Sequence, residues 1–447
     1  MTYLVGGRHT AGLSVVALIA ITAWVGCAPS LGATSTSLPP ELSQTPPDDP
    51  SAATPRESIA NSFPTGTAHA IATVEPGDAG RILQAGNANF DSGDYAAALN
   101  DYSLAIRANR GYAEAYCRRG LAYIEIGDFR SAVGDFASGL GIDPVNPICY
   151  VGRARTWINE SQYDLALEDL NQAERIDPSY SPIYLVRGRL YRILDQPRND
   201  YSRAIADFNT LVLLTPKESV GYLDRGNTFL LAGKPESALA DANIALRLDP
   251  NSAQSHYLRG QIFAATNQPD NAIADLEEAA TLGIQSSDLH VTLGLAYLQV
   301  GNNAEAVQAF TQALELEPRN AQAHFGRGLA HLIAGRNYAA LVDSNAAIQI
   351  KPDYVEALGL RGSVYLRLQR WEDAISDFEK ARELDPKFVE AFFGIAQGQV
   401  GLGRKVDAIQ ALQQYIALAP PGAPNLTQAR LLLASLQNAV ATGTPLP

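Results

Sequence analysis

Residues 355–386 read VEALGLRGSVYLRLQRWEDAISDFEKARELDP, and this segment is one copy of a pattern with a period of 34 residues. Gly362 and Ala374 are small where two helices would cross closely, because larger side chains there would push the helices apart. The closing Asp-Pro ends the second helix, since the residue before a Pro is forced out of helical geometry. A Pro in this place recurs as Pro144, Pro178, Pro216, Pro250, Pro318, Pro352, Pro386 and Pro420. Such a period predicts a helix pair copied many times, which makes a surface and not a catalytic pocket.

Similar residues occupy the same places in ten consecutive units, over about residues 79–422. Counted from Ala113 as the first place of a unit, the eighth place is Gly or Ala and the twentieth is always Ala. The eleventh place is mostly aromatic, as in Tyr297 and Tyr365, and fills the space that the small residues leave. Turn residues such as Gly301-Asn302 separate the two helices. Each unit is therefore expected to be helix, turn, helix and turn.

This pattern resembles the tetratricopeptide repeat. The resemblance implies an all-α fold, a right-handed superhelical α-solenoid of about ten helix-turn-helix repeats. It also implies a protein that binds other proteins, with no catalytic residues, no cofactor and no small-molecule substrate. Residues 423–440 are apolar without the repeat signature, so we expect a capping helix there, followed by a tail over 441–447.

A second regularity links the seventh and twenty-third places of the units. Wherever the seventh is Arg the twenty-third is Asp, and the two units with Leu293 or Ile395 instead have Ala309 or Ala411. We interpret this as a structural ion pair inside each unit, which leaves Asp101 to find another partner, with Arg119 a possible one. The predicted pairs are Arg119 with Asp135, Arg153 with Asp169, Arg187 with Asp207, Arg225 with Asp241, Arg259 with Asp275, Arg327 with Asp343 and Arg361 with Asp377.

The N-terminal residues have the features of an export signal. Arg8 precedes an apolar segment over 13–25, too short for a typical membrane-spanning helix, and Gly26-Cys27-Ala28 follows. This resembles the bacterial lipoprotein signal and predicts a signal peptide over 1–26 and lipidation, such as palmitate, at Cys27. An uncleaved anchor or cleavage near Ala33 are the alternatives, and all three place the repeats outside the cytoplasm, in the cell envelope. The Pro-, Ser- and Thr-rich residues 27–78 are expected to be a disordered tether.

Composition and residue spacing argue against several functions. The net charge of -13, without a basic run, argues against nucleic-acid binding. His256, His290 and His324 recur at the 34-residue period and suggest a metal site, but other units have Tyr or Phe there, so we interpret them as packed aromatic substitutes. Cys117 and Cys149 lie on successive first helices; we favour two independent apolar residues over a disulfide.

The remaining candidate is the inner groove that the resemblance implies, where a partner peptide or amphipathic helix would bind. In that family the groove is lined from the second, fifth, ninth, twelfth and thirteenth places of the first helices. Carried onto this chain, those places include Leu121, Ile124, Val151, Arg155, Ile158, Leu185, Arg189, Arg192, Leu223, Asn227, Leu230, Tyr257, Gln261, Leu295, Leu298, Phe325, Leu329, Leu332, Ser363, Leu366, Arg367, Phe393 and Gln397. About half of the Leu residues would instead pack on a neighbouring helix.

We therefore predict an exported, lipid-anchored scaffold that binds other proteins and is not an enzyme. One alternative is an accessory subunit of a cell-wall or glycan-processing enzyme complex. Another is a metal-dependent enzyme that uses the His row. The inserted residues 196–199 lengthen one turn between helices, and either form a secondary contact or are merely tolerated.

Overall fold

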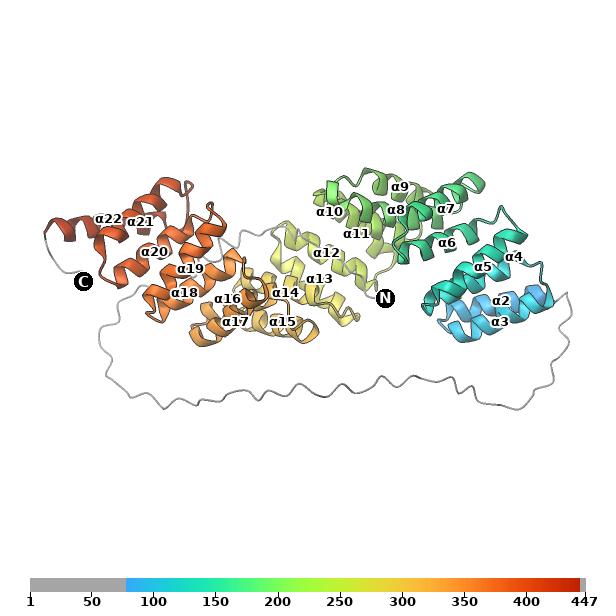
Figure 1. Cartoon of the computed structure of the whole chain (residues 1–447), viewed down its shortest axis with the longest axis horizontal. Coiled ribbons are helices and arrows are strands. Elements are labelled where there is room, and N and C mark those ends of the chain that lie inside the picture. The colour runs from blue at the N-terminus through green and yellow to red at the C-terminus, as the bar shows by residue number, and fades with distance from the viewer. Residues whose placement is uncertain (1–77, 443–447) are drawn as a thin grey trace, which may run out of the picture. The chain divides into compact units, whose positions relative to one another are not determined.

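The computed structural model describes residues 78–442. Over this range the chain forms 21 α-helices and a short 3-10 helix, and it has no strand. The helices follow one another as antiparallel pairs, visible as neighbouring ribbons in Figure 1. The predicted all-α solenoid of repeated helix pairs is confirmed. The predicted signal peptide, Cys27, the tether up to residue 77 and the tail from 443 lie outside the described residues.

Each repeat contributes a first and a second helix. The first helices are α2 (Ala79–Asp91), α4 (Ala113–Glu125), α6 (Pro147–Asn159), α8 (Pro182–Asp195), α10 (Ser219–Leu231), α12 (Ala253–Ala265), α14 (Ser287–Val300), α16 (Ala321–Ile333), α18 (Val355–Arg367) and α20 (Glu390–Gly401). The second helices are α3 (Tyr95–Ala108), α5 (Phe129–Ile142), α7 (Tyr163–Ile176), α9 (Ser202–Leu214), α11 (Pro235–Leu248), α13 (Pro269–Thr281), α15 (Asn303–Leu316), α17 (Asn337–Ile350), α19 (Trp371–Leu384) and α21 (Lys405–Leu418).

Short-range chemistry explains where these helices begin and end. The turn after α14 needs Gly301, whose φ of 85° lies in the left-handed region that favours glycine. The second helix α5 begins after Asp128, whose side chain accepts a hydrogen bond from the backbone N–H of Ser131 and so caps the helix. In eight of the ten repeats a Pro near the end then stops the second helix, and Arg110 and Ile284 take its place in the other two.

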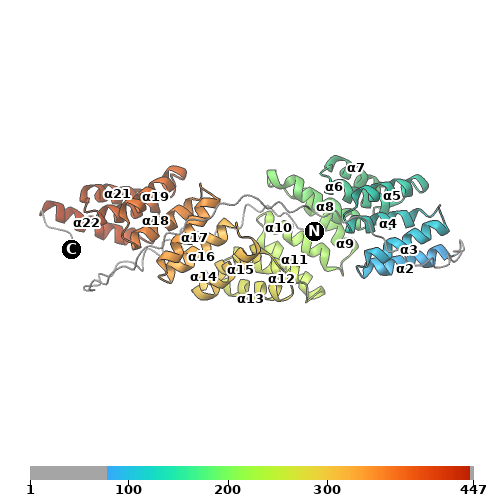
Figure 2. The ribbon, with the colours of Figure 1, turned by 60° about the horizontal axis from the view of Figure 1, so that its bottom comes forward.

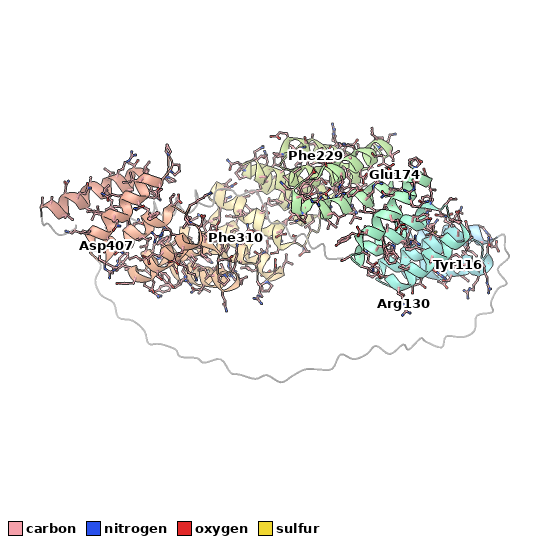
Figure 3. All side chains as sticks on the ribbon, turned by 45° about the horizontal axis from the view of Figure 1, so that its top comes forward. Tyr116, Arg130, Glu174, Phe229, Phe310 and Asp407 are labelled. Carbon is pink, nitrogen blue, oxygen red and sulfur yellow. A yellow bond between two sulfur atoms is a disulfide. The ribbon has the colours of Figure 1, made fainter. Side chains whose placement is uncertain are left out.

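The core between neighbouring repeats is built on matched side-chain sizes. Phe310, labelled in Figure 3, is fully buried between α14 and α16. A Cβ added to Gly294 would lie 2.8 Å from its ring, and one added to Gly326 of the next repeat would lie closer still. Gly294 occupies the eighth place, which the sequence analysis identified. Gly326 occupies the sixth place, which it did not.

The last helix, α22 (Leu426–Ala441), is the predicted cap. It lies beside α21, as Figure 2 shows. Ala429 and Leu436 are buried in the same apolar cluster as Leu412 and Tyr415 of α21. The cap therefore covers the apolar face that the final repeat would otherwise expose to water.

The contacts divide the chain into two compact units, with the boundary between Gly152 and Arg153 inside α6. In the first unit, Cys117 and Cys149 form a disulfide with their Cα atoms 4.9 Å apart. The interpretation of these residues as independent thiols is therefore wrong. It failed because Cys117 and Cys149 stand at different places of successive first helices, the fifth and the third, and the packing of those helices brings them within bonding reach.

The inserted residues form a compact structure of their own. The 3-10 helix η2 (Gln196–Arg198) directly follows α8, and Asn199 then takes a left-handed φ of 52°. Asp195 at the end of α8 is buried and accepts a hydrogen bond from Arg203 of α9. The Arg203 guanidinium also lies over the ring of Tyr191, 4.3 Å from its centroid. These contacts hold the enlarged turn against both helices of its repeat.

Candidate protein-binding surface

All seven predicted Arg–Asp pairs are formed in the structure. In each pair Nε and Nη2 of the Arg donate to the two carboxylate oxygens of the Asp, at 2.6–2.9 Å. The Asp side chains are at most 9% exposed, so the pairs are partly shielded from water. The hydrogen bond to Asp135 raises the pKa of Arg119, which favours its charged form.

The same arginines also reach the preceding repeat, which the sequence analysis missed. Arg361 Nη1 donates to Asn345 Oδ1 at 2.8 Å, and Arg225 Nη1 donates to Asn209 Oδ1 at 2.9 Å. Each such Arg therefore joins the second helices of two neighbouring repeats. A polar residue at the twenty-fifth place of the preceding repeat is the signal that could have revealed this contact.

Asp101 has a different partner from the one considered. Asn89 Nδ2 donates to Asp101 Oδ2 at 2.8 Å. Arg119 instead donates to Ser103 at 3.1 Å, besides its bonds to Asp135. The suggested Arg119–Asp101 contact is therefore wrong, because the guanidinium is already held by these two neighbours.

Two of the three recurring His residues, His256 and His324, occupy structural positions. Nε2 of His256 lies 3.1 Å from the carbonyl oxygen of Pro250, and Nδ1 lies 3.0 Å from Asp275 Oδ1. His324 makes the matching contacts with Pro318 and Asp343. In another repeat the hydroxyl of Tyr184 donates to the carbonyl of Pro178 at 2.8 Å. His thus replaces Tyr in the same hydrogen bond, as expected for a packed aromatic substitute.

Two further properties of the described residues concern metals and membranes. Between residues 78 and 442, no three His, Cys, Asp or Glu side chains are grouped so that they could hold a metal ion. Over the same range, no helix combines the length and the apolar character needed to cross a bilayer.

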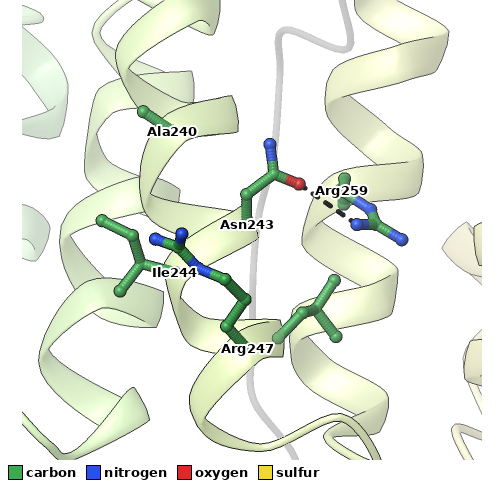
Figure 4. Close-up of a pocket in the computed structure, with 6 residues that line it drawn as sticks. Ala240, Asn243, Ile244, Arg247 and Arg259 are labelled. Carbon is green, nitrogen blue, oxygen red and sulfur yellow. Dashed lines mark hydrogen bonds between the residues drawn. The ribbon is translucent and has the colours of Figure 1, made fainter.

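An open hollow of about 640 Å³ is lined by the second helix α11 and the first helix α12. It is drawn in Figure 4 and is lined by Ala240, Asn243, Ile244, Leu246, Arg247 and Arg259. Asn243 Oδ1 accepts a hydrogen bond from Arg259 at 3.1 Å, and Arg259 also pairs with Asp275. Two of its polar groups are therefore part of the contact between repeats, and none of its lining residues belongs to the predicted groove.

We define the first-helix surface as those side chains at the second, fifth, ninth, twelfth and thirteenth places of the first helices that are not buried in the core. Among the predicted groove residues, the structure places several in the core, at most 6% exposed: Ile124, Val151, Leu298, Phe325, Leu329, Leu332 and Phe393. These residues do not line a surface, because they pack between neighbouring helices. Burial also raises the pKa of Tyr257 to about 12.

The other predicted groove residues are half-buried and reach the first-helix surface: Leu121, Arg155, Ile158, Leu185, Arg189, Arg192, Leu223, Asn227, Leu230, Tyr257, Gln261, Leu295, Ser363, Leu366, Arg367 and Gln397. Most are apolar or carry an amide. Arg189 and Arg192 both donate to Asp224 of the next repeat. Asp224 was not among the residues predicted from the sequence.

Comparison with protein families agrees with this architecture. Models described as Tetratricopeptide repeat match residues 113–146, 223–287, 291–355 and 360–423, and one described as TPR repeat matches residues 86–127. The chain belongs to the tetratricopeptide repeat family. None of the curated proteins compared with the chain matches it in sequence.

Solved tetratricopeptide repeat structures are similar over much of the chain. Yeast Tom70 is 15% identical with a TM-score of 0.37, and the match covers 81% of this chain and 96% of that one. A chain of the APC/C hetero-tetramer Cut9–Hcn1 is 17% identical with a TM-score of 0.46, and the match covers 80% of this chain and 76% of that one. YrrB, described as a TPR protein with an unusual peptide-binding site, is 23% identical with a TM-score of 0.38, covering 42% and 96%.

Tetratricopeptide repeats bind other proteins or peptides and are generally non-catalytic. The chain is accordingly a protein-interaction scaffold.

Proposed function

We propose that this scaffold is exported and lipidated at Cys27, and that it binds a peptide or amphipathic helix of a partner on its first-helix surface. The observation that carries the binding proposal is the row of half-buried apolar and amide side chains on successive first helices. Leu223, Asn227, Gln261 and Leu295 are examples. Apolar side chains of a partner would bury against the Leu residues, while the amides would bond to its backbone or polar groups.

Two features of the chain support export and anchoring. The apolar segment over 13–25 ends at Gly26-Cys27, as in the bacterial lipoprotein signal. The Cys117–Cys149 disulfide suits an oxidising compartment, since cytosolic thiols are normally kept reduced. A scaffold with these features would be held at a membrane in the cell envelope.

The binding proposal is tested by capture of partners from native membranes. Leu223→Glu and Leu295→Glu place a charge on the first-helix surface and are expected to reduce capture strongly. Leu213→Glu is the matched control, because Leu213 is 80% exposed on the second helix α9. Equal capture by all three variants would contradict the proposal.

The anchoring proposal is tested by Cys27→Ser and cell fractionation. Loss of the lipid should move the protein from the membrane fraction to the soluble envelope fraction, because the thiol that carries the lipid is gone. Retention of Cys27→Ser in the membrane fraction at wild-type levels would show that another element anchors the protein.

A further inference from the structure

The first helices α8 and α10 each carry one large apolar side chain that is exposed to solvent. Ile193 is 48% exposed and Leu231 is 44% exposed, and both stand at the thirteenth place of adjacent repeats. Among the ten first helices that the structure describes, only these two large apolar side chains are exposed. We call Arg189, Arg192, Ile193, Leu230 and Leu231 the α8–α10 patch.

Two arginines of the patch are held by one carboxylate. Arg189 donates to Asp224 Oδ2 through Nη2 at 2.6 Å and through Nε at 3.0 Å, and Arg192 Nη1 donates to Oδ1 at 3.2 Å. Asp224 is 4% exposed, whereas the Arg189 side chain is 39% exposed. Asp224 balances only one of the two guanidinium charges, and it fixes the orientation of both groups. The partly exposed Arg189 guanidinium faces solvent on a chain whose net charge is -13.

Asp224 is also larger than the glycine found at the same place in comparable repeats. It stands at the sixth place, after a repeat that has Phe208 at its packing position. The other repeats that follow such a Phe have glycine at this place: Gly152, Gly326 and Gly394. A buried carboxylate is costly unless it is paired, so packing alone gives no reason for Asp here. Local rules of this kind are commonly broken at functional sites.

The one insertion in the repeats lies at the same edge of the surface. Two residues separate Ile193 from the helix η2 (Gln196–Arg198), and Arg198 is exposed there. Arg203 is fixed by Asp195 and by the ring of Tyr191. The chain thus has its enlarged, rigid turn next to the exposed apolar pair and adds a basic side chain to it.

We propose that the α8–α10 patch binds an acidic amphipathic helix of a partner protein. Neighbouring helices lie about 10 Å apart, so Ile193 and Leu231 fit apolar side chains at i and i+7 of a bound helix, which are also about 10 Å apart. Carboxylates one turn away from those side chains would face Arg189 and Arg192. This inference rests on the proposed function, and it adds the place and the charge of the partner.

The proposal is tested with two labelled peptides and the full chain, by fluorescence anisotropy. Both peptides carry Leu at i, i+4 and i+7, and they differ only in having Glu or Lys on the flanks of the apolar stripe. The affinity for the Glu peptide should fall as the salt concentration is raised. The Kd of the Lys peptide should be higher than that of the Glu peptide by about tenfold or more. Ile193→Glu should weaken binding of the Glu peptide about tenfold or more, and Leu213→Glu should not change it. Thermal melts check that both variants fold.

The outcomes separate this proposal from the more general one. Three results would contradict binding at the α8–α10 patch. They are no binding of the Glu peptide, equal binding of the two peptides, and an Ile193→Glu variant that binds like wild type. If Leu295→Glu on α14 weakens binding while Ile193→Glu does not, a partner binds the first-helix surface elsewhere, and the proposed function stands without the patch. If only Leu213→Glu weakens binding, the second helices form the contact and both proposals are wrong.

Discussion

Single residues set how closely one repeat approaches the next. Phe310 fills the space between Gly294 and Gly326. In a repeat without such a Phe, the large side chain can come from the following repeat instead. Where Ser344 takes the place of Phe, the next repeat supplies Leu360, which lies against Gly328. In both cases a large side chain lies against a glycine, as close packing requires.

The first prediction tests this size matching. Gly326→Ala puts a methyl group into the Phe310 ring and should destabilise the protein by about 1–3 kcal/mol in urea unfolding. Gly134→Ala is the matched control, because nothing lies within 4 Å of a Cβ added there. It should be neutral or stabilise by about 0.5–1 kcal/mol, as Ala favours a helix more than Gly does. Equal effects of the two substitutions would contradict the packing argument.

The second prediction concerns the ion pairs inside the repeats. Arg361→Leu leaves the carboxylate of Asp377, which is 8% exposed, without its main partner and should cost about 2 kcal/mol or more. The double variant Arg361→Leu/Asp377→Ala should recover most of that loss, measured by urea unfolding. The chain itself contains this apolar version, as Leu293 with Ala309.

A double variant as unstable as the single one would mean that the pair is needed for more than avoiding a lone charge. The bond from Arg361 to Asn345 of the preceding repeat would then be the first contact to examine.

The third prediction concerns acid and His290. Burial lowers the pKa of His290 in the folded protein, although Glu315 acts in the opposite direction. The unfolded chain therefore binds a proton more readily, so the stability contributed by neutral His290 is present above about pH 6.5 and is lost as the pH falls. His290→Phe removes this term and should make the urea midpoint less sensitive to pH between about 7.5 and 5. An unchanged pH dependence would show that His290 contributes nothing to acid sensitivity.

At the scale of elements, the helix α22 covers the last repeat of the solenoid by packing on α21. The fourth prediction is that a chain ending at Gly422, without α22, loses the burial of Leu436 against α21. Burial of one such side chain contributes about 2 kcal/mol, so the last repeat should show faster amide hydrogen exchange in α20 and α21. Leu431→Ser is the control, because Leu431 is 69% exposed on α22. Unchanged exchange after truncation would mean that α22 is not a cap.

At the scale of the whole molecule, each repeat contacts only its neighbours, so a cross-link acts locally. The disulfide joins residues 32 apart in the sequence, and a loop of this size corresponds to about 3–4 kcal/mol of stabilisation. The fifth prediction is that reduction destabilises the unit that contains α4 and α5, seen as a separate early transition in urea. Peptide mapping without reduction should find Cys117 linked to Cys149, and free alkylation of both thiols would contradict the bond.

Much of the fold could be predicted from the sequence, since each repeat is specified by residues within one period. Gly362, Ala374 and the Asp-Pro before the next repeat act through local geometry, and the paired loss of Arg and Asp revealed a contact between two helices of one repeat. The groove could be predicted only in part. Phe325 and Leu329 occupy surface places in the repeat pattern, but the neighbouring repeat covers them.

The periodic sequence by itself determined the helix pairs, the ion pairs inside them and the existence of a cap, because these depend on residues close along the chain. Only the tertiary structure decided which first-helix side chains stay exposed, that Cys117 meets Cys149, and that Asp224 gathers Arg189 and Arg192. Those contacts join different repeats, and their distances depend on how each repeat is rotated against the next. The residues of a single repeat do not determine that rotation.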